Sequence, residues 1–399
     1  MTRPVIIIGG GPAGLTAART LISAGLQDVL VLERNPEAGG LPRFAAHPGW
    51  GMLDFHRLWN GPRYARELVH AASGAEIRTN ASVVGLQPGG GVEVSTGAGM
   101  ETLRARAVLL AAGIREMPRS ARLLSGTRPW GVVSTGAFQE MVYAGGLRPF
   151  HRPVILGTEL VSFSALLTAR HAGIRPVAMI EPEDRITARR PGDWVARLLL
   201  RVPVLTRTRL VAVEGQPRVE AVVVERDGQR ERIACDGVIL SGRFVPEASL
   251  ARAAHLAMDS GTGGPAIDTH WRCSDPAFFA AGNVLRPVEH SGAAAQEGAA
   301  AARSMLRALG GTLPPPDAAV AVQAAGALRY VYPQRVLPGE GRVRLLARVG
   351  TAQQGRLRVS AGGRVLWQRH ISALPERRVT IPLDTDLLDG ASGVTVELA

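Results

Sequence analysis

The chain has 399 residues, of which 46% are hydrophobic and 47 are glycine, so it is long enough to bury about two or three cores. All 46 of its basic residues are arginine, and the formal net charge is +12. The absence of lysine from the sequence excludes Schiff-base lysine chemistry, pyridoxal catalysis and a P-loop lysine.

The first 33 residues predict a βαβ unit that binds a nucleotide. An apolar strand leads into a glycine motif, a helix follows, and a second apolar strand ends at Glu33. Gly9 permits a tight turn, Gly11 lets backbone N–H groups approach a pyrophosphate, and Gly14 lets the helix pack close to the sheet. The Glu33 carboxylate can accept hydrogen bonds from both hydroxyls of an adenosine ribose. The predicted cofactor-binding residues of this unit are Gly9, Gly11, Pro12, Ala13, Gly14, Glu33 and Arg34.

Two later strands end in small residues and extend this pattern. The run 108–113 reads VLLAAG, the run 278–283 reads FFAAGN, and the pair Gly39-Gly40 closely follows the first acid. Together with the glycine motif, they resemble the flavoproteins with two dinucleotide-binding domains, the pyridine-nucleotide-disulfide reductase type. The resemblance covers about residues 1 to 310 and implies that the cofactor is FAD.

Two further segments resemble a narrower group within these flavoproteins. Residues 39–69 and 113–138 look like those of the NAD(P)/FAD-dependent oxidoreductases of glycerol-3-phosphate operons, and of the FAD-bearing subunits of opine oxidase, hydrogen cyanide synthase and sarcosine oxidase. Members of that group oxidise C–N or C–O bonds of small substrates, or pass electrons between NAD(P)H and a partner subunit. Asn283 replaces the usual Asp, and its amide can still bond a ribitol hydroxyl. The implied FAD contacts are Gly40, Ala112, Gly113, Gly282 and Asn283.

The segment 119–242 is predicted to be a second dinucleotide fold inserted into the first. Its opening strand leads to Gly157, but Glu159 stands where a second glycine belongs and Ser162 where the third belongs. A carboxylate there would repel a pyrophosphate at contact distance. The next strand ends at Glu181, which favours NAD over NADP if a nucleotide binds at all. Two alternatives stay open: a vestigial fold, or a working NAD(P)H site that includes Gly157 and Glu181.

The two cysteines, Cys235 and Cys273, exclude several kinds of redox and metal site. They lie far apart and neither belongs to a C-x-x-C pair, so a redox dithiol, an iron–sulfur cluster and a structural zinc are not predicted. Each is predicted to be a buried small hydrophobe. The related glycerol-3-phosphate operon proteins carry a Cys before a His after the double glycine. Here Ala45 replaces that Cys while His47 is kept, so thiol chemistry at the flavin is not expected, and no metal is predicted.

An alanine-rich helix is predicted from about residue 293 to 309. The resemblance implies that its N-terminus is aimed at N1 and O2 of the flavin, where N–H groups stabilise the anionic reduced form. Ser291 is the predicted N-cap, and Gly292 belongs to the same cofactor-binding set. His290 is a candidate acid–base group or hydrogen-bond donor to the flavin, and His47 is the second catalytic candidate. The alternative for both is a loop histidine bonded to backbone.

The predicted fold class is α/β, with two Rossmann-like dinucleotide-binding domains followed by a small all-β domain. The FAD domain comprises 1–118 and 243–312, separated by the NAD(P)-type insert at 119–242. After three consecutive prolines, short alternating runs predict an antiparallel β-sandwich at 317–399, with arginine outward and valine or leucine inward. This last domain is either a stabilising or dimerising appendage or a docking surface for a partner subunit.

The distribution of arginine argues against nucleic-acid binding, because the residues are scattered rather than clustered. The densest run, 185–201, is predicted to be a solvated loop and helix face, and the alternative is docking of an acidic partner or substrate. The N-terminus shows no signal-peptide core, and no run reaches about eighteen apolar residues. We therefore expect a cytoplasmic protein that does not bind a membrane.

These patterns predict an FAD-dependent oxidoreductase. It transfers a hydride between flavin and a small substrate, which is an amine, an amino acid or a hydroxy compound, or between flavin and NAD(P)H. One alternative is an FAD-holding electron-relay subunit of a hetero-oligomer, with a vestigial NAD(P)H site. A more remote one is a basic, nucleic-acid-binding flavin sensor. The expected partners are the small-molecule substrate and either a partner subunit or a second copy of the chain.

Overall fold

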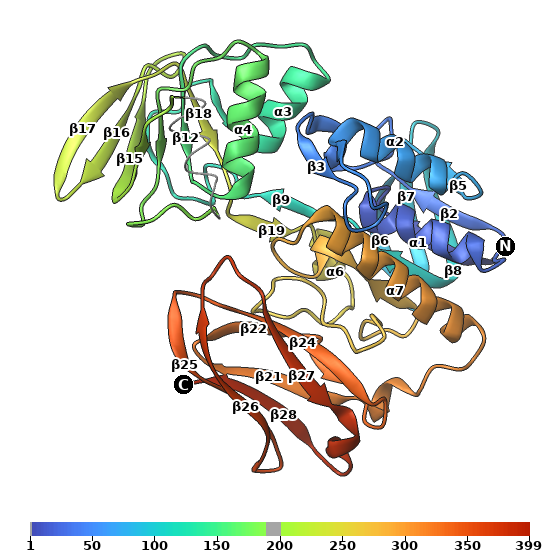
Figure 1. Ribbon diagram of the computed structural model, residues 1–399. Coiled ribbons are helices and arrows are strands. Elements are labelled where there is room, and N and C mark those ends of the chain that lie inside the picture. The colour runs from blue at the N-terminus through green and yellow to red at the C-terminus, as the bar shows by residue number, and fades with distance from the viewer. Residues whose placement is uncertain (1, 189–200) are drawn as a thin grey trace.

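Three lobes make up the molecule, which we describe from a computed structural model of residues 2–188 and 201–399 (Figure 1). The first lobe carries the N-terminal strands and helices together with a later segment that returns to it. The second lobe is inserted between these two parts, and the third contains the C-terminal strands. The exact domain boundaries given above stay predictions.

A seven-stranded mixed sheet forms the centre of the first lobe. Its order is β5-β2-β1-β8-β7-β6, and β20 also pairs with β8. The pairs among β5, β2, β1, β8 and β20 are parallel, whereas β6, β7 and β8 pair antiparallel. The strands are β1 (Thr2–Ile8), β2 (Val29–Leu32), β5 (Glu76–Arg78), β6 (Ser82–Gln87), β7 (Gly91–Thr96), β8 (Gly99–Leu110) and β20 (Phe278–Ala280).

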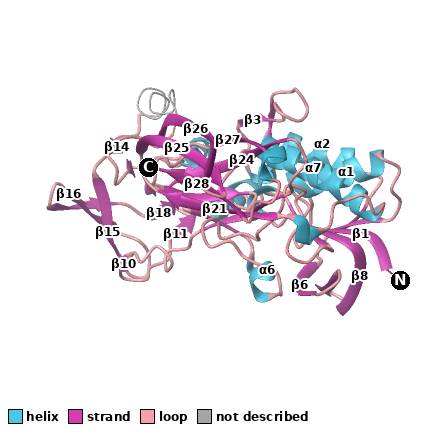
Figure 2. Ribbon diagram, turned by 90° about the horizontal axis from the view of Figure 1, so that it is seen from below, coloured by secondary structure: helices cyan, strands magenta, loops and turns pink. Residues whose placement is uncertain are grey.

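Helices cover one face of this sheet, as Figure 2 shows. In β1, Val5 and Ile7 are buried beneath the helices, while Ile6 and Ile8 are buried in the core on the opposite face. Successive side chains of a strand point to opposite faces, so the continuous apolar run of β1 is covered on both sides. The helices are α1 (Pro12–Ser23), α2 (Gly61–Ala71) and α7 (Ser291–Leu309).

Glycine allows α7 to pack closely against the first turn of α1. A Cβ on Gly298 would lie 2.0 Å from the carbonyl oxygen of Ala13. A Cβ on Gly282, just after β20, would lie 2.9 Å from the Ala13 Cβ. The chain that returns from the second lobe therefore brings the start of α7 beside the glycine motif.

The second lobe is joined to the first by two paired strands, β9 (Ile114–Glu116) and β19 (Phe244–Pro246), with α6 (Ser249–Ala253) after them. Its two sheets have the orders β11-β18-β12-β13-β14, all parallel, and β10-β15-β16-β17. The elements are β10 (Ser125–Gly126), β11 (Val132–Ser134), α3 (Thr135–Tyr143), β12 (Pro153–Leu156), α4 (Leu160–His171), β13 (Ala178–Ile180), β14 (Val204–Leu205), β15 (Thr208–Glu214), β16 (Ala221–Arg226), β17 (Gln229–Ala234) and β18 (Gly237–Leu240).

Two facing sheets with a shared core form the third lobe, in the orders β23-β21-β28-β25-β26 and β22-β24-β27. Buried and more exposed side chains alternate clearly along β25, where Leu357 and Val359 are fully buried and Arg356 and Arg358 are not. The strands are β21 (Val320–Gly326), β22 (Leu328–Tyr332), β23 (Arg335–Val336), β24 (Arg342–Val349), β25 (Gln353–Ala361), β26 (Arg364–Ala373), β27 (Val379–Asp384) and β28 (Gly393–Leu398).

The arginine-rich run touches the third lobe at its first residue. Arg185 donates two hydrogen bonds of 3.0 Å to the two carboxylate oxygens of Glu376. Its start is therefore an intramolecular contact and not only a solvated face, while residues 189–200 of the run lie outside the described residues. Within the described ranges, no helix combines the length and apolarity needed to cross a membrane.

Candidate functional site

The carboxyl end of β1 forms a backbone cradle at the start of α1. Gly9 has a φ of 111°, and a Cβ there would lie 2.4 Å from the Ala111 carbonyl oxygen, so only glycine fits. A Cβ on Gly14 would lie 1.9 Å from the Gly9 carbonyl oxygen. A Cβ on Gly11 would meet only the Cα of Gly40, at 3.9 Å, which leaves its outer side open. The structure thus brings together the predicted residues Gly9, Gly11, Pro12, Ala13 and Gly14.

The first turn of α1 offers N–H groups to an anion. Its N-cap is Gly11, so no side chain caps this fully described helix, and Pro12 has no N–H of its own. The N–H groups of Ala13 and Gly14 have no partner within the helix, because first-turn donors never do. The positive end of the helix dipole acts in the same direction. This arrangement is suited to a pyrophosphate.

Glu33 lies beside the glycine motif at the end of β2. Its side chain is buried, Oε2 accepts from the Gly10 N–H at 2.9 Å, and Oε1 accepts from the Asn35 N–H at 2.8 Å. Each carboxylate oxygen can accept a second hydrogen bond, so the held group can still receive two ribose hydroxyls. Arg34, the next predicted residue, is exposed.

Three more predicted residues lie at the same edge of the sheet. A Cβ on Gly40 would come within 2.9 Å of the Cα of Gly11, so the double glycine packs directly on the glycine motif. Ala112 and Gly113 follow β8, whose end pairs in parallel with the end of β1. Carboxyl ends of parallel strands form the edge at which ligands bind in such sheets.

Asn283 closes a loop in front of α7. Its Oδ1 accepts from the Glu289 N–H at 2.8 Å, and its Nδ2 donates to the Glu289 carbonyl oxygen at 3.1 Å. The amide nitrogen has a second hydrogen, so one donor remains for a ribitol hydroxyl.

His290, and not Ser291, is the N-cap of α7. His290 has φ −62° and ψ 146°, and its Nδ1 accepts from the Gly292 N–H at 3.3 Å. The helix already begins at Ser291, so the predicted serine cap is wrong. Asn283 holds the backbone of Glu289 through two hydrogen bonds. The imidazole of the next residue, His290, then reaches the Gly292 N–H, which has no partner within the helix. Because Nδ1 accepts, the proton of the neutral ring is assigned to Nε2.

Trp50 brings the two predicted catalytic histidines together. Its ring centroid lies 5.8 Å from that of His47 and 6.5 Å from that of His290. The Nδ1 of His47 lies 2.9 Å from the carbonyl oxygen of Pro48, which can only accept, so the lone pair of a neutral His47 is on Nε2. The buried Nε1 of Trp50 has no hydrogen-bond partner among the described residues. The site therefore combines one free ring nitrogen with two N–H donors.

A tyrosine and an aspartate support this tryptophan. The Tyr64 hydroxyl of α2 donates to Asp54, and the Tyr64 ring lies 6.0 Å from that of Trp50. Burial, and then the neighbouring carboxylate, raise the pKa of Tyr64. Asp54 lies in the loop between β3 (Pro48–Trp50) and β4 (Trp59–Asn60). Sequence reasoning missed these residues, although aromatic side chains are concentrated here in a chain that is only 5% aromatic.

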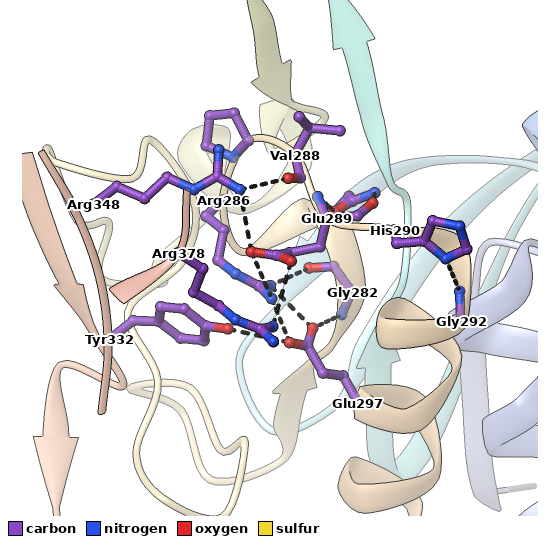
Figure 3. Close-up of polar contacts among 12 residues, drawn as sticks. Gly282, Arg286, Val288, Glu289, His290, Gly292, Glu297, Tyr332, Arg348 and Arg378 are labelled. Atoms are coloured by element: carbon purple, nitrogen blue, oxygen red, sulfur yellow. Dashed lines mark hydrogen bonds and ion pairs between the residues drawn. The ribbon is translucent and has the colours of Figure 1, made fainter. Parts of the chain in front are cut away.

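A buried ionic cluster lies against α7 and was also missed (Figure 3). Arg286 is fully buried and binds both carboxylate oxygens of Glu297, one of them at 3.0 Å. Its guanidinium lies 4.3 Å from the ring centroid of Tyr332, whose hydroxyl donates to Glu297 at 3.1 Å. Glu297 also accepts from the Gly282 N–H at 3.1 Å. No sequence motif reveals such a pair, since a loop and a helix turn separate its members.

In the second lobe, a carboxylate fills the equivalent of the cradle. Gly157 follows β12 with a φ of 112°, and Glu159 is the N-cap residue of α4. One Glu159 oxygen lies 2.4 Å from where a Cβ of Gly157 would be, and the other 2.0 Å from where a Cβ of Gly242 would be. Burial raises the pKa of Glu159, and the negative charge of Glu181 raises it further. The acid thus lies against the backbone that a pyrophosphate would have to approach.

Glu181 is enclosed by its own chain. It is buried at the end of β13, and its Oε2 accepts from the hydroxyls of Thr158 and, at 3.4 Å, of Thr187. Its Oε1 accepts from the Glu183 N–H at 3.1 Å. The structure brings the predicted pair Gly157 and Glu181 to the same edge of the parallel sheet of the second lobe. The Glu181 carboxylate, however, already accepts hydrogen bonds from nearby residues.

The prediction that each cysteine is a buried small side chain is confirmed. Cys235 and Cys273 are both free and buried. Burial raises the pKa of the Cys235 thiol to about 11 and also raises that of Cys273. Both are therefore inert thiols at neutral pH.

Comparisons with known proteins agree with this geometry. The family model described as pyridine nucleotide-disulphide oxidoreductase matches residues 3–298. The alpha subunit of sarcosine oxidase from Rhizobium meliloti (strain 1021) is 28% identical over 359 residues, which is 84% of this chain and 33% of that protein. An opine oxidase subunit of Rhizobium meliloti is 26% identical over 319 residues, 70% of this chain and 58% of that protein. The chain therefore spans a third to somewhat over half of these relatives' lengths.

A solved structure shows the same fold. The crystal structure of thioredoxin reductase from T. acidophilum matches with a TM-score of 0.64 and 22% identity, and covers 76% of this chain and 97% of that one. The fold is thus α/β, of the FAD- and NAD(P)-binding type with mixed sheets.

Proposed function

This chain belongs to the pyridine nucleotide-disulphide oxidoreductase family, and from that premise we propose that it oxidises a small amine, amino acid or hydroxy compound at FAD. As a member of the family it is a flavin-dependent oxidoreductase. The residues of the first lobe fit FAD, because the α1 N-terminus is uncapped, Gly11 faces open space, and the Trp50 indole N–H is buried without a partner in the described chain.

One observation supports the direction of electron flow in this proposal. Glu159 lies against Gly157 and Gly242 in the second lobe, where a pyridine nucleotide would place its phosphates. Two like charges at contact distance in a buried site disfavour each other strongly. Electrons therefore enter from the substrate rather than from NAD(P)H, and the second lobe is a vestigial nucleotide fold.

The chain's residues orient FAD, which when bound supplies the acceptor for a hydride. The start of α1 binds the pyrophosphate, Glu33 binds the adenosine ribose, and Asn283 binds the ribitol chain. At the other end, the first turn of α7 and the Nε2–H of His290 would hold the flavin pyrimidine with positive potential. That potential would favour negative charge on the flavin when it accepts the hydride.

His47 takes the proton that substrate oxidation releases. When the C–H bond of an amine or alcohol gives up its hydride, a C=N or C=O bond forms and an N–H or O–H proton must leave. The Nε2 of His47 is free to accept it, since Nδ1 is bonded to the Pro48 carbonyl. The Trp50 ring lies near both histidine rings.

A second candidate function, an electron-relay subunit, is favoured by exposed apolar side chains in the segment 41–58. Leu41, Met52, Leu53 and Leu58 are 55%, 56%, 47% and 65% exposed, and His47 lies in the same segment. A concentration of exposed apolar side chains typically marks a protein interface. Two relatives are themselves subunits by name, so a partner subunit here fits a hetero-oligomer. We also propose that the protein is cytoplasmic.

Anaerobic flavin reduction tests the proposal. The purified holoprotein is expected to be yellow and to bleach with one class of small compound, tried as sarcosine, amino acids and 2-hydroxy acids. NADH and NADPH should bleach it slowly or not at all. If no small compound bleaches the flavin and only a reduced partner protein does, the result would favour the relay function. Rapid reduction by micromolar NADH would contradict both.

His290→Ala tests the role of the cap. Loss of the Nε2–H donor should lower the flavin midpoint potential and slow substrate-driven reduction by about 10²-fold, the lower range for loss of one preorganised hydrogen-bond donor. FAD should stay bound. A lower melting temperature with an unchanged potential would show that His290 is only structural.

A further inference from the structure

The loop that presents His290 is held from two lobes at one residue, Glu289. Its backbone is bonded to Asn283 of the first lobe. Its carboxylate is bonded to Arg348 and Arg378 of the third lobe (Figure 3). We propose that Glu289 is a positioning residue through which the C-terminal β-sandwich sets the orientation of His290 toward the flavin. This inference rests on the proposed function, because it assumes FAD at the start of α7.

The carboxylate of Glu289 meets arginines from separate parts of the third lobe. Its Oε1 accepts from Arg348 of β24 at 3.3 Å, and its Oε2 accepts from Arg378, just before β27, at 3.4 Å. Arg286, within the loop itself, lies 4.0 Å away. The side chains of Glu289 and Arg348 are only 10% and 14% exposed, so their contact acts with little screening by water. Arg378 is 40% exposed, so its contact is more strongly screened. Arg348 also donates to the Val288 carbonyl oxygen at 2.8 Å.

The backbone of Glu289 explains why an asparagine stands at position 283. Its amide both accepts from the Glu289 N–H and donates to the Glu289 carbonyl oxygen. An aspartate could accept but not donate, and its charge would repel that carbonyl oxygen. The side chain thus serves as a two-sided clasp on Glu289, in addition to any contact with the cofactor.

His290 is the next residue, and its freedom is limited on both sides. Its Nδ1 is bonded to the Gly292 N–H, and its own N–H follows the clasped peptide of Glu289. With the Glu289 peptide held and Nδ1 bonded, the range of directions open to the Nε2–H is narrowed. Without the contacts from Arg348 and Arg378, the loop before α7 would be more mobile, and the His290 imidazole would point toward the flavin in a smaller fraction of molecules. The third lobe is thereby part of the site although it contributes no atom to it.

Glu289→Gln in the full-length holoenzyme tests this coupling. Glutamine keeps the size of the side chain and removes the charge that attracts both arginines. The expected result is a midpoint potential lower by about 30 mV, equivalent to a tenfold change in the two-electron equilibrium. Substrate-driven kcat should fall about tenfold, while KM and FAD content stay unchanged. Asn283→Asp, which removes the donor of the clasp, should shift the potential in the same direction.

Glu376→Gln is the matched control. It breaks another Arg–Glu contact of the third lobe, with Arg185 in the second lobe, and that contact does not involve the loop before α7. Its potential should equal that of the wild type. An unchanged potential in Glu289→Gln, or an equal shift in Glu376→Gln, would overturn the inference. If the potential shifts in Glu289→Gln while no small compound reduces the wild type, the substrate proposal fails and the coupling stands.

Discussion

The segments that lead into α1 and α4 have the same strand–turn–helix geometry, but they offer an anion opposite electrostatic potentials. Each follows a parallel strand and a glycine of nearly equal φ, 111° at Gly9 and 112° at Gly157. Each glycine N–H donates at 2.9 Å to the last residue of the neighbouring strand. Each neighbouring strand is followed by a buried acid, Glu33 in one lobe and Glu181 in the other.

The difference lies in one side chain near the start of each helix. In the first lobe Gly11 leaves the cradle open, whereas in the second Glu159 folds into it. The backbone course alone therefore does not define a nucleotide site, because a single carboxylate reverses the sign of the potential that the helix offers. Four substitutions can break or sharpen this comparison.

Gly14→Ala should have the largest effect. Its Cβ would lie 1.9 Å from the Gly9 carbonyl oxygen, so the turn must move and the cradle must widen. Overpacking of this kind costs about 1–3 kcal/mol, and here the cost falls on the pyrophosphate site. We expect protein with little bound FAD, measured as flavin absorbance per protein. Ser162→Ala, at the matching position in the second lobe, should keep full FAD content. Equal flavin in both variants would contradict the comparison.

Glu33→Ala should weaken FAD binding by about 1.5–3 kcal/mol, the scale of a hydrogen bond to a charged group. Titration of apoprotein with FAD, followed by quenching of flavin fluorescence, measures the change in Kd. Glu181→Ala is the control, since its carboxylate contacts only the second lobe. An unchanged Kd for Glu33→Ala would mean that the buried acid only supports its turn.

Glu159→Gly should speed reduction of the flavin by NADH about tenfold, because it removes the like charge and restores backbone access. Stopped-flow absorbance under anaerobic conditions measures the rate, with Glu140→Gly of α3 as a control for loss of an acid elsewhere in the second lobe. No gain in rate would show that some other feature closes the nucleotide site.

Glu159→Gln should have the smallest effect, a pH-dependent gain in stability. The pKa of Glu159 is raised in the folded protein, so the unfolded chain releases this proton first as pH rises. Stability is therefore lost between the ordinary pKa of glutamate and the raised value, and glutamine avoids that loss. We expect a melting temperature about 2 °C above the wild type at pH 8, and no difference at pH 4. A gain that is equal at both pH values would be inconsistent with a charge effect.

The sequence predicted the strand, turn and helix around the glycine motif because these parts are local, and the binding roles of the residues stay predictions. The strand, the glycine motif and Glu33 lie within about thirty residues, and the chain's own backbone leaves no room for a Cβ at Gly9 or Gly14. The cap of α7 was predicted one residue too late. Serine is the better capping residue by propensity, but the clasp of Asn283 on Glu289 placed His290 at the cap position.

By itself the sequence determined the nucleotide-binding βαβ unit and the damaged glycine motif of the second lobe, since each depends on residues close along the chain. It also showed that neither cysteine belongs to a C-x-x-C pair. Only the tertiary structure decided which distant side chains meet. It placed Trp50 beside His290, paired Arg286 with Glu297, and brought Arg348 and Arg378 to Glu289. Such contacts arise from the packing of lobes, which selects them through shape and burial and leaves no periodicity or spacing in the chain.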